Sequence, residues 1–543
     1  MSSKHIQDIL EAVPARYRGP GGAVAVLQEG RLVAQHAWGY ADLQARTLMT
    51  PATLMPVCSI TKQMVCLILT DLARNPTPAM VQRGSPGSQQ LADALDQILP
   101  RALPRDPGGL QLEHLCHNQS GLRDYWAMSA LWGSRPDARF TVADDARQAL
   151  DRTRSLHFEP GTQYAYCNLN FHILARVAET VSGQSLGDLL ADRLFAPARM
   201  ATAALCPDNA ALPPPCVGYE GDEAGGFVPA VNRMQWSGDA GVVASLEDMV
   251  AYEQYLDRSW DDPGSLYRAI ADAPSFKDGT PARYGYGLEH RRVGSVPVIG
   301  HGGALRGFRL HRFQAHSERM AVVVMLNHER DAEEVAGHIL SEALRLPTPR
   351  GSTVQPAAGW TGTFFDPEAR LIAQTRPGGP GRAIVSYAGA DEVVGLLRAS
   401  HGESSTLQAS LTHGGETLVL HRLEDNRHIR AQRIPAGQAP PRDGDGHGHG
   451  YTGRYHCADV DSTFHCTGAG GMLYGSFDGY LGEGPAHLMR YVGQDIWALS
   501  CPRGLDAPAP GDWTLVFQRD KGGRVVGVEM GCWLARGVVY ARQ

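Results

Sequence analysis

The sequence predicts an α+β domain, in which helices flank one antiparallel sheet, followed by two all-β antiparallel barrel domains. Strand-like segments occur at both ends of the first domain, residues 1–346, with helical segments between them. Beyond that domain, short strand-like segments alternate with glycine-rich turns, and a short aromatic motif occurs twice. A chain of 543 residues is also too long for a single hydrophobic core.

The first domain should begin and end with elements of one sheet. We expect a helix over residues 3–15 and then strands over residues 23–27 and 32–36, which a glycine separates as in a hairpin. A long helical region begins at Ser59, and a helix over residues 332–344 closes the domain. Three late strands are expected at residues 296–299, 308–313 and 320–326.

Two linkers divide the rest of the chain, at residues 347–352 and 438–450. Each is followed by an aromatic-Thr-Gly-x-aromatic motif, which begins at Trp360 and again at Tyr451, about ninety residues later. Coincidence in a glycine-rich sequence is the alternative, but the position just after each linker favours a repeat. The expected barrel domains are residues 354–437 and 450–543, each of a size that suits a small closed barrel.

Composition excludes several classes of partner. A net charge of -7 disfavours nucleic acid, and no apolar run is long enough to cross a membrane. Asp8 and Glu11 fall where a signal peptide would have its apolar core, so we expect a cytoplasmic protein. His447 and His449 lie in a glycine-rich linker, and no cluster has the spacing of metal ligands, so we expect no metal or organic cofactor.

The strongest chemical signal is Ser59-Ile60-Thr61-Lys62 at the start of an apolar helix. Residues three apart share a helix face, so the Ser59 hydroxyl and the Lys62 amine should lie side by side. A lysine can activate a serine only if burial or nearby positive charge lowers its pKa. The alternative is an ordinary helix start, in which Ser59 or Thr61 caps the helix and Lys62 reaches solvent.

Two further motifs supply groups that such a serine would need. Tyr166 and Asn168 form Y-x-N, in which a phenol can move protons and an amide can orient the lysine and a substrate carbonyl. His301 begins His-Gly-Gly-Ala after a strand, where Gly303 lets a substrate approach the sheet edge and the Ala304 amide can join that of Ser59 as an oxyanion donor. Glu113 and His114, in the loop of residues 112–122, are interpreted as scaffold.

In this order, Ser-x-x-Lys, Tyr-x-Asn and His-Gly-Gly resemble the penicillin-recognising serine hydrolases, which include class C β-lactamases, carboxypeptidases, esterases and D-aminopeptidases. The resemblance covers residues 5–345, is most specific from Pro160 to Asn168, and implies a β-lactamase/penicillin-binding-protein-like first domain. His301 departs from the common pattern, since many members have a lysine there that grips a substrate carboxylate. We therefore expect weak activity on β-lactams and on peptides recognised by a carboxylate.

The whole chain resembles D-stereospecific aminopeptidases, in which two related eight-stranded barrels follow the hydrolase domain. The resemblance implies a loop from the last barrel that reaches the active site, with Asp506 meeting the free amino group of the substrate. The matching loop is Pro502, Arg503, Gly504, Leu505, Asp506, Ala507, Pro508, Ala509, Pro510, Gly511 and Asp512. A second candidate, rich in turn residues, is the loop of residues 477–484.

The resulting prediction is a serine hydrolase that releases N-terminal D-amino acids from small peptides, amides or esters through an acyl-enzyme. Ser59 would attack, Lys62 with Tyr166 would take the proton, and Asn168 would orient them. Alternatives are an esterase or D,D-peptidase with the same machinery, or a sensor that binds β-lactam or peptidoglycan without turnover. The resemblance also implies a possible homodimer.

Overall fold

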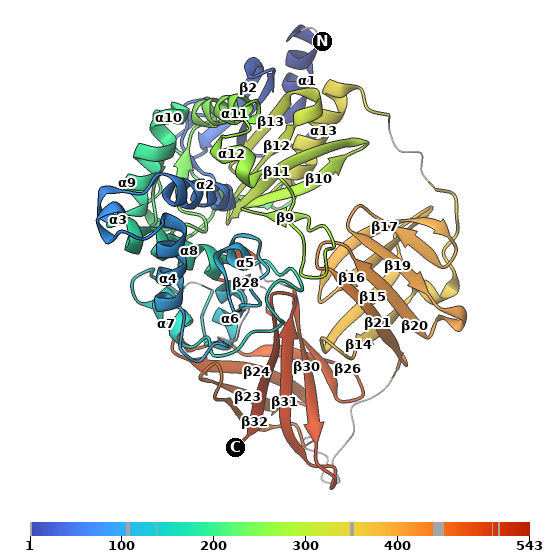
Figure 1. The fold of residues 1–543 in the computed structure, drawn as a ribbon. Coiled ribbons are helices and arrows are strands. Elements are labelled where there is room, and N and C mark those ends of the chain that lie inside the picture. The colour runs from blue at the N-terminus through green and yellow to red at the C-terminus, as the bar shows by residue number, and fades with distance from the viewer. Residues whose placement is uncertain are drawn as a thin grey trace.

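One antiparallel sheet forms the centre of the first domain in the computed structural model (Figure 1). Its strands follow the order β3-β2-β1-β13-β12-β11-β10-β9, so the two ends of the domain meet where β1 pairs with β13. The described residues are 3–104, 109–136, 138–347, 352–437, 450–501, 503–505, 507–508 and 511–543. The sheet strands are β1 (Gly21–Gln28), β2 (Arg31–Asp42), β3 (Thr47–Leu48), β9 (Tyr284–Gly285), β10 (Leu288–Val293), β11 (Val296–Leu305), β12 (Phe308–Ala315) and β13 (Met320–Leu326).

Helices cover both faces of this sheet, which explains why β1 and β13 are apolar along almost their whole length. On one face, α1 (Ser3–Arg16) and α13 (Ala332–Leu344) pack against Val24 and Val324. On the other face, α2 (Thr61–Arg74), α8 (Asn168–Ser182) and α11 (Leu246–Trp260) form the larger core. The predicted helices and strands at both ends of the domain are therefore confirmed, as is the single sheet that they form.

The remaining elements of the first domain are short. The helices are α3 (Pro78–Arg83), α4 (Gly87–Ile98), α5 (Leu112–Cys116), α6 (Tyr125–Leu131), α7 (Asp145–Asp151), α9 (Leu186–Leu190), α10 (Ala196–Ala198) and α12 (Leu266–Ile270). The strands are β4 (Met55–Pro56), β5 (Ala204–Leu205), β6 (Tyr219–Asp222), β7 (Gly226–Pro229) and β8 (Val242–Ala244). Of these, β4, β8 and β5 form a small sheet that leads directly into the turn carrying Ser59.

The rest of the described chain forms two closed antiparallel barrels, as predicted. The first is closed by pairing of β14 with β21, and the second by pairing of β23 with β24. The first contains β14 (Gly362–Asp366), β15 (Leu371–Pro377), β16 (Arg382–Tyr387), β17 (Ala390–Arg398), β18 (His401–Glu403), β19 (Leu407–Leu411), β20 (Thr417–Arg422) and β21 (Arg427–Ile434). The second contains β22 (Gly453–Cys457), β23 (Ser462–Ala469), β24 (Met472–Gly479), β25 (Gly482–Glu483), β26 (His487–Gly493), β27 (Ile496–Ser500), β30 (Asp512–Arg519), β31 (Val525–Cys532) and β32 (Ala535–Arg542).

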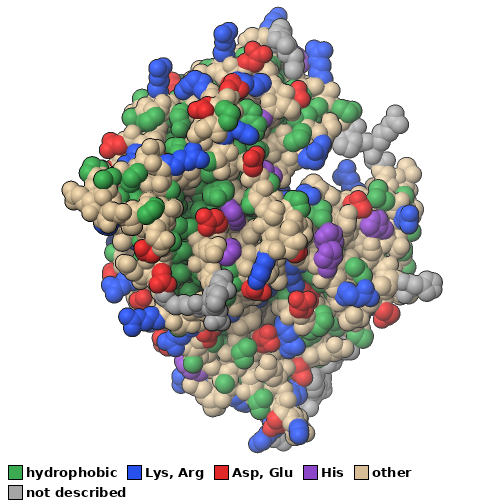
Figure 2. Space-filling model, in the orientation of Figure 1, with side chains coloured by type: hydrophobic (Ala, Val, Ile, Leu, Met, Phe, Trp, Pro, Cys, Tyr) green, Lys and Arg blue, Asp and Glu red, His purple; other side chains and the backbone are tan. Residues whose placement is uncertain are grey.

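The repeated motif marks the same structural position in both barrels. Trp360 and Tyr451 are fully buried, and the glycine two residues later opens the first strand of each barrel. On the face shown in Figure 2, acidic and basic side chains are intermixed rather than gathered by sign. Among the described residues, no helix is both long and apolar enough to cross a membrane.

A buried ion pair joins the sheet to the helices behind the candidate site. Arg312 on β12 binds Glu253 on α11 through two contacts, one of them 2.9 Å long, and both side chains are fully buried. The same guanidinium donates a 3.2 Å hydrogen bond to Gln63, the residue next to Lys62 on α2. The pair therefore fixes the position of α2 against the sheet.

We predict that Glu253→Gln lowers the free energy of unfolding by about 3–5 kcal/mol, because Arg312 would stay buried without its counter-charge. Urea denaturation measures the loss. The control is Asp261→Asn, which breaks a pair with Arg319 in which the aspartate is 61% exposed, and it should cost about 0–1 kcal/mol. Equal losses in both variants would contradict this account.

Candidate active site

Ser59 lies in a tight turn that ends at the start of α2. It is the middle residue of a 3-10 turn, Cys58–Ile60, and it is 8% exposed. Cys58 has a φ of 51°, a left-handed conformation that is uncommon for residues other than glycine and often marks functional sites. Neither helix start carries a side-chain cap, since the Thr61 hydroxyl instead accepts a 3.1 Å bond from the Val242 amide. The ordinary capping alternative is therefore not what the structure contains.

Lys62 is completely buried and its amine contacts three separate segments. Nζ donates to Ser59 Oγ at 2.9 Å, to Asn168 Oδ1 at 2.8 Å and to the Asp239 carbonyl at 2.6 Å. These bonds use all three donors of an ammonium. Burial lowers the pKa of Lys62 to about 8, although Asp239 and Asp124 oppose the shift. A substantial fraction of Lys62 is therefore neutral at mildly alkaline pH and can accept a proton.

Tyr166 contacts the same hydroxyl. Its phenol donates to Ser59 Oγ at 2.7 Å, and Lys62 Nζ lies 4.9 Å from the centre of its ring. Burial raises the pKa of Tyr166 well above its usual value, and the bond to Ser59 only partly offsets this. The phenol is therefore protonated at neutral pH, which suits a group that passes protons on rather than a standing phenolate.

Two aspartates that sequence motifs did not reveal hold this group in place. Asp124 accepts bonds from the Asn168 amide at 2.9 Å and from Asn168 Nδ2 at 3.3 Å, which turns Asn168 Oδ1 toward Lys62. Burial raises the pKa of Asp124 to about 7. The Asp239 carboxylate accepts from Tyr125 and from the Ser237 amide at 2.9 Å, which fixes the carbonyl that binds Lys62. Asp124 lies two residues after the loop of residues 112–122, in which Glu113 and His114 are interpreted as scaffold.

His301 is buried beside Tyr166, with 6.3 Å between the two ring centres. Its Nδ1 lies 2.6 Å from the Gly302 carbonyl and its Nε2 lies 3.1 Å from the Tyr284 hydroxyl. A carbonyl only accepts, so Nδ1 carries the proton and Nε2 can accept from Tyr284. Burial lowers the pKa of His301, although Glu289 opposes the shift, so the ring is neutral.

Gly303 brings strand β11 against the turn that carries Ser59. A Cβ at this position would lie 2.3 Å from the Val57 carbonyl oxygen, so only glycine allows this approach. Ala304 follows on the same strand and pairs with Arg309 of β12. The structure thus places the predicted sheet edge beside the nucleophile turn.

Both predicted loops of the last barrel contact the first domain. In the loop of residues 502–512, β28 (Arg503–Gly504) pairs with β29 (Ala507–Pro508) and contacts α6, and Leu505 is buried (Figure 1). Pro502, Asp506, Ala509 and Pro510 lie outside the described residues. The loop of residues 477–484 packs instead at the far end of α6, where the Leu481 amide donates to the Trp132 carbonyl at 3.0 Å.

A third contact from the last barrel was not predicted. The hairpin between β31 and β32 places the Leu534 carbonyl 3.2 Å from the Asp124 amide. Next to it, Trp533 packs on the aromatic cluster of Tyr164 and Tyr284, against which Tyr166 also packs. The last barrel is therefore connected to Lys62 through Asp124 and Asn168. No spacing in the sequence signals such a contact.

Comparison with known proteins agrees with the fold and with the arrangement of the site. The family model for beta-lactamases matches residues 6–346, and the model described as D-aminopeptidase, domain B, matches residues 353–541. A D-aminopeptidase of Brucella canis is 41% identical over 99% of this chain and 98% of its own length. One of Brucella anthropi is also 41% identical, over 99% of each chain. The structure of an octameric penicillin-binding protein homologue from Pyrococcus abyssi shares the fold, with a TM-score of 0.53, 18% identity, and coverage of 80% of this chain and 100% of that one.

The first domain and its buried serine and lysine thus define a serine hydrolase of the β-lactamase type. Within that class, identity over nearly the full length of both chains shows that this chain belongs to the D-aminopeptidase family.

The pKa of Lys62 predicts how the reactivity of Ser59 depends on pH. Labelling of Ser59 by a fluorophosphonate should speed up about tenfold per pH unit up to about pH 8 and then level off, because only the neutral amine can take the proton. Labelling rates between pH 6 and 9.5 measure this. Lys277→Ala, which changes an exposed lysine, should leave the profile unaltered. A rate that does not vary with pH over this range would contradict the role of Lys62.

Proposed function

We propose that this protein is a D-aminopeptidase, which releases N-terminal D-amino acids from small peptides, amides or esters through an acyl-enzyme. The observation that carries the proposal is the convergence of Lys62 Nζ and Tyr166 OH on one buried serine hydroxyl, at 2.9 and 2.7 Å. The D-aminopeptidases at 41% identity support the choice of substrate. Self-association as a homodimer stays a prediction.

The proposed reaction has two halves. Ser59 Oγ attacks the substrate carbonyl while neutral Lys62, assisted by Tyr166, accepts the hydroxyl proton. The amides of Ser59 and Ala304 stabilise the oxyanion, and losing one such donor typically costs about 10²–10³ in rate. Tyr166 then returns the proton to the departing amine or alcohol. In the second half, water attacks the acyl-enzyme, gives up a proton to the same base, and releases the acid and Ser59.

The neutral state of His301 affects which substrates the site can bind. A neutral imidazole that already bonds Gly302 and Tyr284 offers no positive charge to a substrate carboxylate. We therefore propose that penicillins and peptides recognised by a C-terminal carboxylate are poor substrates.

We propose that the carboxylate of Asp506 binds the free amino group of the substrate. An ammonium ion in a shielded site favours a carboxylate partner, and such a charge-assisted bond is worth about 1.5–3 kcal/mol. The described part of the same loop contacts α6, which begins one residue after Asp124. This proximity to the site supports the proposed role.

We predict that the protein hydrolyses D-alanine p-nitroanilide much faster than the L-enantiomer. Ser59→Ala should lower kcat by about 10³–10⁶-fold, because the nucleophile is lost. Release of p-nitroaniline is the readout, and Ser295→Ala, at an exposed turn, is the control.

Three outcomes would oppose this function. Turnover retained in Ser59→Ala would exclude the nucleophile. Acylation without release would favour the sensor, and ester hydrolysis that needs no free amine would favour the esterase.

We predict that Asp506→Ala weakens hydrolysis of D-alanine amide about 10- to 100-fold and spares an N-acetyl-D-alanine ester, which has no ammonium ion to bind. The comparison uses kcat/KM for both substrates. Asp478→Ala, in the other candidate loop, should affect neither, since Asp478 already pairs with His465 at 2.6 Å. Equal losses of kcat/KM on both substrates in Asp506→Ala would show that Asp506 does not bind the substrate amine.

A further inference from the structure

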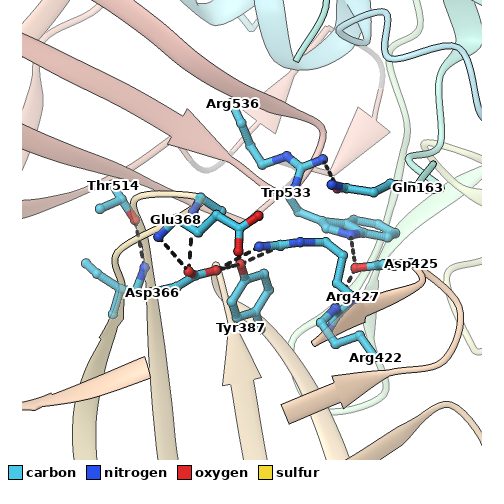
Figure 3. A network of polar contacts seen from close by, with 12 residues as sticks. Gln163, Asp366, Glu368, Tyr387, Arg422, Asp425, Arg427, Thr514, Trp533 and Arg536 are labelled. Atoms are coloured by element: carbon cyan, nitrogen blue, oxygen red, sulfur yellow. Dashed lines mark hydrogen bonds and ion pairs between the residues drawn. The ribbon is translucent and has the colours of Figure 1, made fainter. Parts of the chain in front are cut away.

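A cavity of about 200 Å³ lies where the first domain meets both barrels. Its walls include Arg123, His157, Gln163, Glu368, Arg427 and Arg536. Figure 3 shows Arg536 reaching from the last barrel to Gln163 of the first domain, and Arg427 of the first barrel reaching to Asp366 and Tyr387. This cavity plays no part in the proposed reaction.

Arg536 is the unusual member of this group. It is only 8% exposed, yet its guanidinium bonds neutral groups alone, namely Gln163 Oε1 at 2.9 Å and His157 Nδ1 at 3.4 Å. Among the described residues, no carboxylate lies within 4 Å of it, whereas buried arginines normally have such a partner. Burial and the charge of Arg427 lower the pKa of Arg536 to about 10.

The neighbouring groups reinforce this positive charge. Arg123 is also 8% exposed. Its guanidinium donates hydrogen bonds to the carbonyl oxygens of Arg536, Gly537 and Ser155 and to the Ser155 hydroxyl. The carboxylate of Asp459 lies 3.9 Å from it. His157 Nε2 is buried without a hydrogen-bond partner within the described part of the chain. Burial, with Arg536, Arg123 and Arg427, lowers the pKa of His157 well below its usual value, so this ring cannot share the charge.

Two acidic side chains, Glu368 and Glu529, also line the cavity, and the carboxylates of Asp425 and Asp366 act on Arg536 without bonding it. Glu368 is exposed. Glu529 pairs with Arg370 at 3.2 Å. Arg427 is neutralised by Asp366 at 2.8 Å, and Arg123 has the Asp459 carboxylate at 3.9 Å. Among the described arginines that line the cavity, Arg536 is therefore the one without a carboxylate within 4 Å.

We infer that this cavity is a binding site for a small oxyanion, held by Arg536 with help from Arg123 and His157. A carboxylate should bind better than phosphate, because Glu368 and Glu529, which also line the cavity, oppose a second negative charge. The bound oxyanion would join all three domains. It would also contact the segment that leads to Tyr166, since Gln163 lies three residues before it.

A carboxylate built into the chain at position 163 can test whether Arg536 binds an anion. Gln163→Glu replaces the amide that Arg536 already contacts by a carboxylate of the same shape, so the variant should carry its own counter-ion. We predict a higher apparent Tm than the wild type in sodium chloride, by about 2–4 °C. Gln184→Glu, the same change on an exposed side chain, is the matched control.

The binding measurement compares apparent Tm in sodium acetate, sodium phosphate and sodium chloride at equal ionic strength and pH. In the wild type and in Gln184→Glu, acetate should raise Tm in a saturable way by about 2–4 °C, and phosphate by less. In Gln163→Glu and in Arg536→Gln the response should disappear. Isothermal titration of the wild type with acetate gives a second readout that does not depend on how well Arg536→Gln folds.

Two results would overturn the site. A wild type that responds to acetate no more than to chloride would mean that the protein balances the charge itself, for example with Glu368. If acetate raised the apparent Tm equally in Gln163→Glu and in the wild type, acetate would bind at a site other than this cavity.

Discussion

The burial of Lys62 is the constraint on which the rest of the site depends. A fully buried ammonium requires a partner for each of its three donors, and these come from the Ser59 turn, the start of α8 and the segment before β8. Any movement of one segment would leave a donor without an acceptor. The same burial lowers the pKa of the amine to about 8, so one structural feature provides both the geometry and the basicity.

This constraint extends into the last barrel. Asn168 can face Lys62 because Asp124 holds its amide, and Asp124 in turn donates its own amide to the Leu534 carbonyl. The barrel therefore supports the catalytic groups of the first domain through this backbone contact, in addition to the role proposed for Asp506. On the other side, Arg312 and Glu253 anchor α2 through Gln63. These two sets of contacts act on neighbouring residues of α2, Lys62 and Gln63.

Local spacing explains what could be predicted from the sequence. Ser59 and Lys62 share a helix face, Tyr166 and Asn168 are two residues apart in the chain, and the aromatic repeat at Trp360 and Tyr451 marks the barrels. Alternation and apolar runs likewise predicted the strands and helices of the first domain. The aspartates at 124 and 239 were missed because their roles depend on contacts with residues far away in the chain. The contact of Leu534 is made by its backbone carbonyl, so the identity of its side chain gives no indication of it.

The most direct test of this account is the pKa of Lys62 itself. The chain contains only four lysines, Lys4, Lys62, Lys277 and Lys521, so NMR spectra of protein labelled with ¹³C at lysine Cε should show few signals. We expect one signal to titrate near pH 8 and to be absent from the spectrum of Lys62→Arg. If the signal that is lost in Lys62→Arg titrated above pH 10 in the wild type, Lys62 would be charged at working pH and could not activate Ser59.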